Sequence, residues 1–411
     1  MKGTIAYCAT PRAGGVFAHY RALREALTPR GWTVHAVSGG QAMSRLWQND
    51  FPDEGCIRIA DDTNDPHDVA RAMADWCASE NVDVLFLTAP DYSLPAWNAV
   101  RHISPSVRIV SRAYDTTPFS YRAVVIHPDR LSAVIATSQR QYDDLLGGGY
   151  VDTARLHLIP HTVRDAFLNA GSRRADRGPR ETIRLGYAGR LNEAQKGIFL
   201  LPELGRCLSD LRIPWTLDVL GEGPDEQALA RRCVKAGVEA HVRFHGRRSR
   251  EEVAAHMAQW DVFIMPSRHE GFGIALIEAM AAGAVPVVHR IRGVTDWIVE
   301  TGKTGWVVEQ GDLTAMTDII GRLHADHSLL RTVCTAAQQA VSERFHPDTM
   351  AQQYDALFEG LLREDPANEP LPWSAFRPAR FPRSAMNRFI HAFVPRALRG
   401  RIGRWTHKVS S

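Results

Sequence analysis

The chain repeats one pattern twice: short runs rich in β-branched residues alternate with longer stretches whose apolar residues recur at helical spacing. This rhythm is typical of βαβ units that build a parallel sheet covered by helices. In the first half, a helical pattern over 16–27 follows the first strand-like run, and the strand-like runs are 4–9, 33–38, 82–88, 107–111, 133–137 and 156–159. We therefore predict a doubly wound, Rossmann-like domain over residues 1–170.

The pattern restarts after residues 171–182, which are polar and basic and have the composition of a linker. The second set of strand-like runs is 183–188, 215–220, 242–245, 262–265 and 285–289. We predict a second Rossmann-like domain over 183–346 and a terminal helix over 347–363 that crosses back to the first domain. Open α/β sheets bind ligands at the carboxyl ends of their strands, so the active site is expected in a cleft between the domains.

Composition narrows the class of protein further. Of 411 residues, 45% are hydrophobic and 23% charged, which is typical of a globular protein, and the net charge of +3 is too small for a nucleic-acid-binding surface. The six cysteines form no CxxC pair and no zinc-ligand spacing, which favours reduced thiols. The sequence shows no secretory signal and no run of about 20 apolar residues, so we expect a cytoplasmic protein without a transmembrane helix.

One segment, residues 265–288, carries most of the functional information. A strand is expected to end at its start, a loop with Gly271 and Gly273 follows, and a helix begins near Ile274. The glycines allow the backbone to approach a ligand, and the free N–H groups of a helix start attract anions. The segment therefore predicts a phosphate site.

Two carboxylates, Glu270 and Glu278, flank this predicted site with seven residues between them. In this spacing, and over the chain up to about residue 362, the sequence resembles glycosyltransferase family 4. The resemblance implies a retaining enzyme of the two-domain GT-B type that uses a nucleoside diphosphate sugar and needs neither metal nor other cofactor. By the same resemblance, Glu270 binds the donor sugar's hydroxyls and Glu278 those of the ribose. The backbone amides of Phe272, Gly273 and Ile274, next to Gly271, would hold the distal phosphate.

Two further blocks of the second domain fit a nucleotide sugar. Arg190 and Lys196 follow the strand-like run 183–188, and cations at the carboxyl end of a strand suit a diphosphate. The family resemblance implies that both stabilise the leaving nucleoside diphosphate. Gly221 and Gly223 follow the next strand, where relatives border the nucleotide base.

The first domain offers weaker candidates. Gly14 and Gly15 lie between the first strand and helix, where the family also carries a glycine pair, and predict a second anion-accepting loop assisted by Arg12. In the segment SRAYDTTPF, Tyr114 stands before Asp115 where many relatives have histidine. Asp115 is accordingly either a catalytic residue or a turn and helix-capping residue.

Two other features leave alternatives open. His161 is either a packed residue beside the linker or a ligand contact, and the exposed-looking pair Asp61 and Asp62 would suit a metal, although the resemblance implies none.

The tail, residues 364–411, has no acidic residue after Glu369. Its basic residues and the apolar helical face at 386–394 suit an anionic membrane surface, with packing against the first domain or a loose tail as the alternatives.

Together these features predict a retaining glycosyltransferase that moves a sugar from a nucleotide-sugar donor to a hydroxyl acceptor. The acceptor would be a glycan or a lipid-linked intermediate of cell-surface polysaccharide synthesis, and a peripheral position on the inner face of the plasma membrane would follow from a membrane-binding tail. Two alternatives remain: a nucleotide-sugar epimerase of the same architecture, and a catalytically silent sugar-nucleotide-binding or scaffolding protein.

Overall fold

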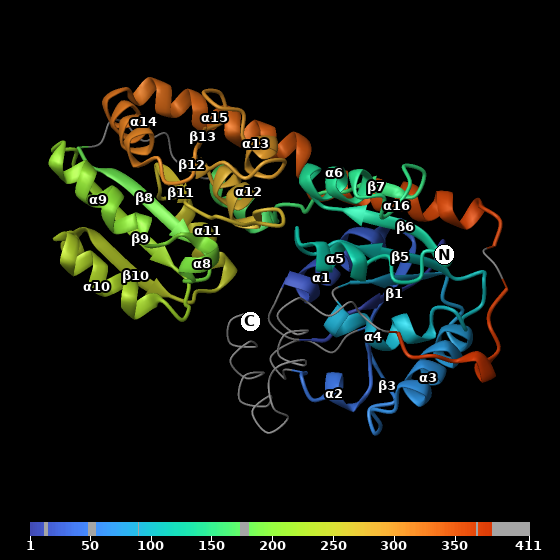
Figure 1. Ribbon diagram of the computed structural model, residues 1–411. Coiled ribbons are helices and arrows are strands. Elements are labelled where there is room, and N and C mark those ends of the chain that lie inside the picture. Colours follow the sequence, from blue (N-terminus) through green and yellow to red (C-terminus); the bar gives the residue numbers. More distant parts are fainter. Residues whose placement is uncertain (12–14, 48–54, 89, 173–180, 367–368, 380–411) are drawn as a thin grey trace, which may run out of the picture.

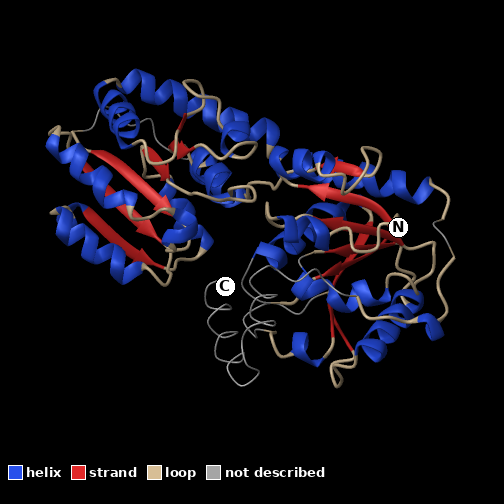
Figure 2. Ribbon diagram, viewed as in Figure 1, coloured by secondary structure: helices blue, strands red, loops and turns tan. Residues whose placement is uncertain are grey.

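The computed structural model describes residues 1–11, 15–47, 55–88, 90–172, 181–366 and 369–379. Figure 1 shows two lobes, each an α/β layer structure with its sheet between helices, and Figure 2 marks the sheets in red. The predicted fold class, two doubly wound Rossmann-like domains, is confirmed by the sheets and by the solved structures described below.

The first sheet has seven strands in the order β3-β2-β1-β4-β5-β6-β7, and every recorded strand pair is parallel. The order changes direction between β1 and β4, which is the switch point at which such sheets bind ligands. The strands are β1 (Gly3–Cys8), β2 (Trp32–Gly39), β3 (Cys56–Ile59), β4 (Val84–Leu87), β5 (Arg108–Arg112), β6 (Leu131–Ala136) and β7 (Leu156–Leu158). The helices of this lobe are α1 (Gly15–Leu27), α2 (Gln41–Ser44), α3 (Pro66–Ser79), α4 (Pro90–Ala99), α5 (Pro118–Ala123) and α6 (Gln139–Gly147), with a 3-10 turn at Thr28–Arg30.

The second sheet has six parallel strands in the order β10-β9-β8-β11-β12-β13. These are β8 (Ile183–Ala188), β9 (Trp215–Leu220), β10 (Val242–Gly246), β11 (Val262–Met265), β12 (Val285–His289) and β13 (Trp306–Val308). The helices are α8 (Glu193–Lys196), α9 (Leu200–Asp210), α10 (Glu226–Ala236), α11 (Arg250–Met257), α12 (Ile274–Ala281), α13 (Thr295–Ile298), α14 (Leu313–Ala325) and α15 (His327–Arg344), with a 3-10 turn at Glu239–His241. Each face of each sheet carries its own apolar core.

Two helices join the lobes. Helix α7 (Asp165–Ser172) buries Phe167 in the core of the second lobe against α11 and α12, although the sequence pattern placed residues up to 170 in the first domain. Helix α16 (Pro347–Arg363) returns to the first lobe, as Figure 1 shows, and buries Tyr354 and Phe358 against α1 and the sheet. Asp355 fixes this position because it accepts from Lys2 at 2.8 Å and from the Trp32 indole at 2.7 Å.

The lobes also touch directly at the carboxyl ends of their strands. The Arg140 amide donates to the Gly293 carbonyl at 2.9 Å. Gly271, in the loop before α12, lies against the backbone of Tyr114 and Asp115 in the first lobe. The donor-site loop predicted from sequence therefore lies at the boundary between the lobes.

Candidate active site

The start of α12 forms the centre of the site. Strand β11 ends at Met265, and the loop reaches α12 through Gly273, whose φ of 96° is the left-handed conformation that favours glycine. Within the described chain, no side chain caps this helix start, so its first N–H groups are suited to an anion. The Phe272 ring is buried between His161 and Phe345, which leaves only its backbone for a ligand.

Lys196 and Glu270 meet beside this helix start. Lys196 Nζ lies 2.7 Å from Glu270 Oε1, and the Ser267 hydroxyl donates to the same oxygen at 2.7 Å. The side chains of Lys196 and Glu270 are only 19% and 10% exposed. Gly197 explains why they meet: it turns with a φ of 60°, and a Cβ there would lie 2.2 Å from the Pro266 carbonyl oxygen, so the turn after α8 packs directly on the β11–α12 loop.

The other predicted cation, Arg190, occupies a different environment. Its side chain is exposed, and its carbonyl accepts a hydrogen bond from the Tyr187 hydroxyl at 3.0 Å, which fixes the backbone of the β8–α8 loop. No ion pair is recorded for Arg190 among the described residues. The structure thus pairs Lys196, at the end of α8, with Glu270 and leaves the Arg190 side chain exposed on the loop that leads into α8.

Glu278 lies on the second turn of α12 and is half-buried. Burial raises the pKa of its carboxyl to about 7, and the neighbouring guanidinium groups of Arg164 and Arg250 counteract part of this increase. Arg164 precedes α7 and Arg250 begins α11, so the carboxyl lies where three helices converge. The group therefore titrates near neutral pH.

Gly221 and Gly223 are required by packing. Gly221 has a φ of 122°, and a Cβ there would lie 2.0 Å from the Gly189 carbonyl oxygen. A Cβ at Gly223 would lie 2.2 Å from the Leu191 carbonyl oxygen. The β9–α10 loop therefore rests on the β8–α8 loop that carries Arg190, and its shape supports that loop whatever it binds.

The first lobe contributes less of what the sequence predicts. Gly15 is the exposed first residue of α1 with open space around its Cα, whereas Gly14 and Arg12 lie outside the described residues. Asp115 Oδ1 accepts from the Thr117 amide at 2.8 Å and from its hydroxyl at 2.6 Å, which is a turn before α5. The structure thus brings the Asp115 backbone to Gly271 while the Asp115 side chain is engaged locally.

Three residues of the first lobe lie close to this boundary. The sequence analysis left the role of His161 open and did not single out His19 or Arg112. His161 packs edge-on against Phe272 and His19, with ring centroids 5.2 and 5.6 Å apart. Burial and the Arg112 guanidinium hold the pKa of His161 and of His19 well below its usual value. Arg112 ends β5 and is 4% exposed. In the sequence, Arg112 could have been noticed as a charged residue directly after the strand-like run 107–111.

The possible metal ligands named from sequence, Asp61 and Asp62, are exposed and belong to neither metal-compatible group among the described residues. Those groups are Asp65 with His67 and Asp68, and Asp218 with His245 and His256. In the latter group, His245 Nε2 lies 2.7 Å from Asp218 Oδ1, so these two side chains already satisfy each other's hydrogen bonding.

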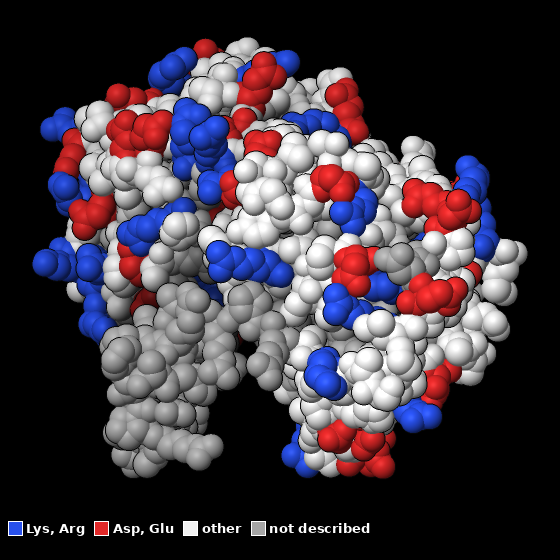
Figure 3. All heavy atoms as spheres, turned by 45° about the vertical axis from the view of Figure 1, so that its right-hand side comes forward, with Lys and Arg blue, Asp and Glu red and all other residues white. Residues whose placement is uncertain are grey.

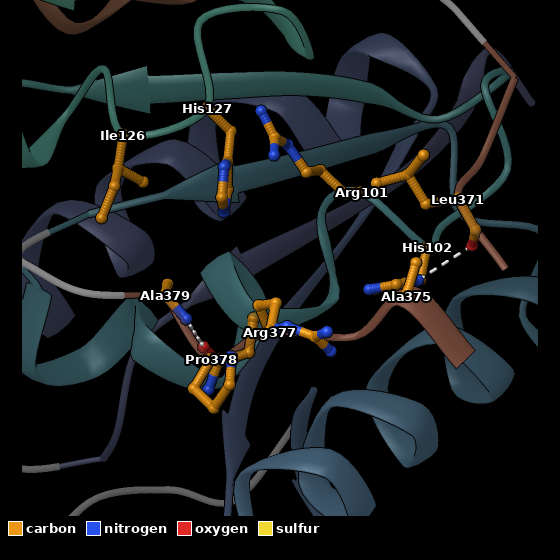
Figure 4. Close-up of a pocket in the computed structure, with 10 residues that line it drawn as sticks. Arg101, His102, Ile126, His127, Leu371, Ala375, Arg377, Pro378 and Ala379 are labelled. Carbon is orange, nitrogen blue, oxygen red and sulfur yellow. Dashed lines mark hydrogen bonds between the residues drawn. The ribbon is translucent and has the colours of Figure 1, made fainter. Parts of the chain in front are cut away.

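The segment after α16 packs against the start of β5, the end of α4 and the residues that follow α4. Trp373 stacks on His102 with ring centroids 4.4 Å apart, and the Ala379 amide donates to Asn98. Figure 4 shows the cavity that this segment, with its Arg377, lines together with Arg101, His102 and His127. The cavity has a volume of about 440 Å³. The strongly basic part of the tail, from 380 onward, lies outside the described residues, so the predicted membrane-binding face is not described.

On the face in Figure 3, basic and acidic side chains of the described residues alternate, without a continuous basic patch. Among the described helices, none has the length and apolar character to cross a membrane.

The chain is similar in sequence to known glycosyltransferases. Residues 172–340 match the family described as "Glycosyl transferases group 1". The chain is 24% identical over 385 residues to N-acetyl-alpha-D-glucosaminyl L-malate synthase of Bacillus anthracis, covering 89% of this chain and 99% of that protein. It is 27% identical to phosphatidyl-myo-inositol mannosyltransferase of Mycobacterium leprae, covering 84% and 93%.

Solved structures show the same fold. A glycosyltransferase from Rickettsia africae superposes with a TM-score of 0.70 at 18% identity, covering 88% of this chain and 99% of that one. Anabaena Alr3699/HepE in complex with UDP superposes with a TM-score of 0.68 at 20% identity, covering 87% and 100%. The architecture is therefore GT-B. The resemblance to this class of glycosyltransferases, and the expected enzyme class of a hexosyl- or related glycosyltransferase, are confirmed.

Proposed function

We propose that this protein is a retaining glycosyltransferase that moves a sugar from a nucleoside diphosphate sugar to the hydroxyl group of a glycan or lipid-linked acceptor. The observation that carries this proposal is the Lys196–Glu270 pair at 2.7 Å beside the uncapped start of α12. A cation and a carboxylate beside a helix start are the groups that would bind the diphosphate and the hydroxyls of such a donor. Relatives named as N-acetylglucosaminyl and mannosyl transferases support the substrate class.

In the proposed reaction, the bond between the sugar's anomeric carbon and the diphosphate oxygen breaks, and a bond to the acceptor oxygen forms on the same face. The acceptor proton passes to the departing phosphate. Negative charge develops on the diphosphate, so Arg190, Lys196 and the N–H groups at Gly273 and Ile274 stabilise the transition state.

The carboxylates bind the donor. Glu270 orients the sugar hydroxyls, and Lys196 turns from Glu270 to the diphosphate when the donor enters. Glu278 accepts from the ribose hydroxyls in its ionised form. The side chain of Asp115, engaged with Thr117, is proposed to hold the turn that faces Gly271. The reaction as proposed uses no metal and no cofactor.

Location and pathway belong to the same proposal. The relatives include a putative colanic acid biosynthesis glycosyltransferase of Salmonella typhimurium, which favours a role in cell-surface polysaccharide synthesis. We propose a cytoplasmic enzyme that attaches to the inner membrane face through its basic tail. Co-sedimentation of full-length protein and a form ending at residue 379 with anionic vesicles tests the attachment, and equal binding of both forms would refute it.

The test of the reaction is a panel of nucleotide sugars, scored for release of nucleoside diphosphate with and without acceptors. Lys196→Met and Arg190→Met should each lower turnover by about 100-fold or more, in line with the loss of one transition-state donor. Arg184→Met, which removes an exposed cation from β8, is the matched control and should turn over normally. Near-normal turnover in both site variants would refute these roles.

Two alternatives remain distinguishable in the same panel. An epimerase would change the donor sugar in the absence of any acceptor, which proton NMR detects. A silent binding protein would bind a nucleotide sugar in calorimetry and release no product with any acceptor.

A further inference from the structure

Arg112 is a buried cation in the first lobe that has no counter-ion among the described residues. Its side chain is 4% exposed, and its Nε and Nη1 atoms are shielded from water and have no hydrogen-bond partner within the described chain. It forms no ion pair with a carboxylate among the described residues. Arg108, on the same strand and equally buried, also has an Nε without a partner among the described residues, but its two terminal nitrogens donate to the carbonyls of Asp365 and Glu364.

The described groups on which Arg112 acts electrostatically carry no negative charge at neutral pH. It acts electrostatically on His19, His161, Tyr7 and Tyr354, which come from α1, the loop after β7, β1 and α16. Burial keeps both histidines neutral and both tyrosines protonated at neutral pH, because it lowers the histidine pKa values and raises those of the tyrosines. The Tyr7 hydroxyl is already hydrogen-bonded to His19 Nδ1 at 3.0 Å.

An arrangement of this kind is unfavourable for the protein alone. A buried guanidinium that has lost water without gaining partners destabilises the fold, and two donor nitrogens without acceptors add to that cost. Such a group persists where a bound anion completes it, since a guanidinium can bind a carboxylate or phosphate through two parallel hydrogen bonds.

The position of Arg112 relates it to the active site. It ends β5 at the carboxyl edge of the sheet, the edge at which open α/β sheets bind ligands. Two residues further on, the backbone of Tyr114 and Asp115 packs against Gly271. From the other side, His161 links it to the donor loop through its contact with Phe272 at 5.2 Å.

We propose that Arg112 is the anion-binding residue of the acceptor site, so that the acceptor carries a carboxylate or phosphate close to the hydroxyl that receives the sugar. This inference rests on the proposed transferase function and makes it specific. Because Arg112 belongs to the first lobe and the donor groups Glu270, Glu278 and Lys196 to the second, its anion comes from the acceptor.

The test uses the full chain and pairs of acceptors that differ only in charge: malate with its dimethyl ester, and glycerol 3-phosphate with glycerol. Arg112→Gln should raise KM for the charged acceptor of the productive pair by about 10- to 100-fold, as expected for lost hydrogen bonds to a charged group. The control variant Arg184→Met, outside the site, should leave both this KM and the slow hydrolysis of the donor as in the wild type. Arg112→Lys should have a KM for the charged acceptor between those of the wild type and Arg112→Gln.

Stability measurements keep the proposal testable without turnover. In the absence of acceptor, Arg112→Gln should melt no lower than the wild type because it removes an uncompensated charge. The control, Arg108→Gln, should melt lower because it leaves two carbonyls without their donors. With the donor's nucleoside diphosphate present, inorganic phosphate or malate should raise the melting temperature of the wild type and not that of Arg112→Gln.

Several results would overturn the proposal. If Arg112→Gln melts well below the wild type, the guanidinium is a structural group. If its effect falls on donor affinity in calorimetry, the anion belongs to the donor. Preference of the wild type for neutral acceptors, or no stabilisation by either anion, would exclude an anionic acceptor at Arg112. Failure of the transferase function itself would show separately, as no nucleoside diphosphate release with any donor.

Discussion

Replacing Lys196 by methionine should destabilise the second lobe by about 2 kcal/mol. Removing one partner of a fully buried ion pair costs about 3–5 kcal/mol, because the other charge stays buried and uncompensated. Here the two side chains are 19% and 10% exposed, and Glu270 keeps the Ser267 hydroxyl at 2.7 Å, so a smaller loss is expected. For a lobe of this size, about 2 kcal/mol corresponds to a decrease in melting temperature of about 4–8 °C.

The same pair predicts a compensating change. Glu270→Gln alone should cost about 1 kcal/mol, because Lys196 can extend toward water. The double variant Lys196→Met with Glu270→Gln should be less destabilised than the sum of the single variants by at least about 1 kcal/mol, since neither uncompensated charge remains.

Differential scanning fluorimetry of the four proteins measures this coupling. The exposed pair Lys303–Glu300, at 2.9 Å with both side chains more than half exposed, is the matched control. Lys303→Met should change the melting temperature by less than about 2 °C, because exposed pairs contribute little. Additive effects of Lys196→Met and Glu270→Gln, or a Lys196→Met protein as stable as the control, would refute the reasoning.

Three further predictions concern the surrounding loops and helices. Gly221→Ala should reduce stability by several kcal/mol and lower donor affinity, because its Cβ would lie 2.0 Å from the Gly189 carbonyl oxygen. The control Gly237→Ala, at a position with positive φ and open space, should cost about 1 kcal/mol. Equal melting temperatures of the two variants would contradict this prediction. The pKa of Glu278 in the folded protein is raised to about 7, above its unfolded value, so the native state binds the extra proton and its stability should fall as pH rises from about 5 to 8. Glu278→Gln should flatten this dependence of stability on pH. An unchanged dependence in the variant would contradict the prediction. Donor affinity should rise over the same pH interval as the ribose-binding carboxylate ionises, and calorimetry at pH 6 and 8 should find no such rise in Glu278→Gln.

The alternating pattern predicted most of both sheets. Strands β8, β9, β11 and β12 have the predicted bounds, and β1, β2 and β5 differ by one residue at each end. The sequence analysis missed β3, where the exposed Arg58 interrupts a short apolar run, and the three-residue β13. It also missed α4, where Pro95 inside the helix reads as a break.

The sequence predicted which residues belong to the candidate site but not which of them contact one another. Glycines, carboxylates and cations near strand ends indicate an anion site from sequence alone, and Gly273 does have the backbone conformation that such a loop needs. The pairing of Lys196 with Glu270 depends on the packing of Gly197 against Pro266, which no local pattern encodes. Arg112 was overlooked because burial and missing partners are properties of the folded chain.

The most direct test of the proposed function is the stereochemistry of the product. Once a donor and acceptor pair is found, NMR of the product gives the anomeric configuration from the one-bond carbon–hydrogen coupling constant at the anomeric position. A retaining transferase predicts the same configuration as in the nucleotide sugar, with rates about 100-fold or more lower in Lys196→Met. A product of inverted configuration, or a changed donor sugar without transfer, would contradict the account.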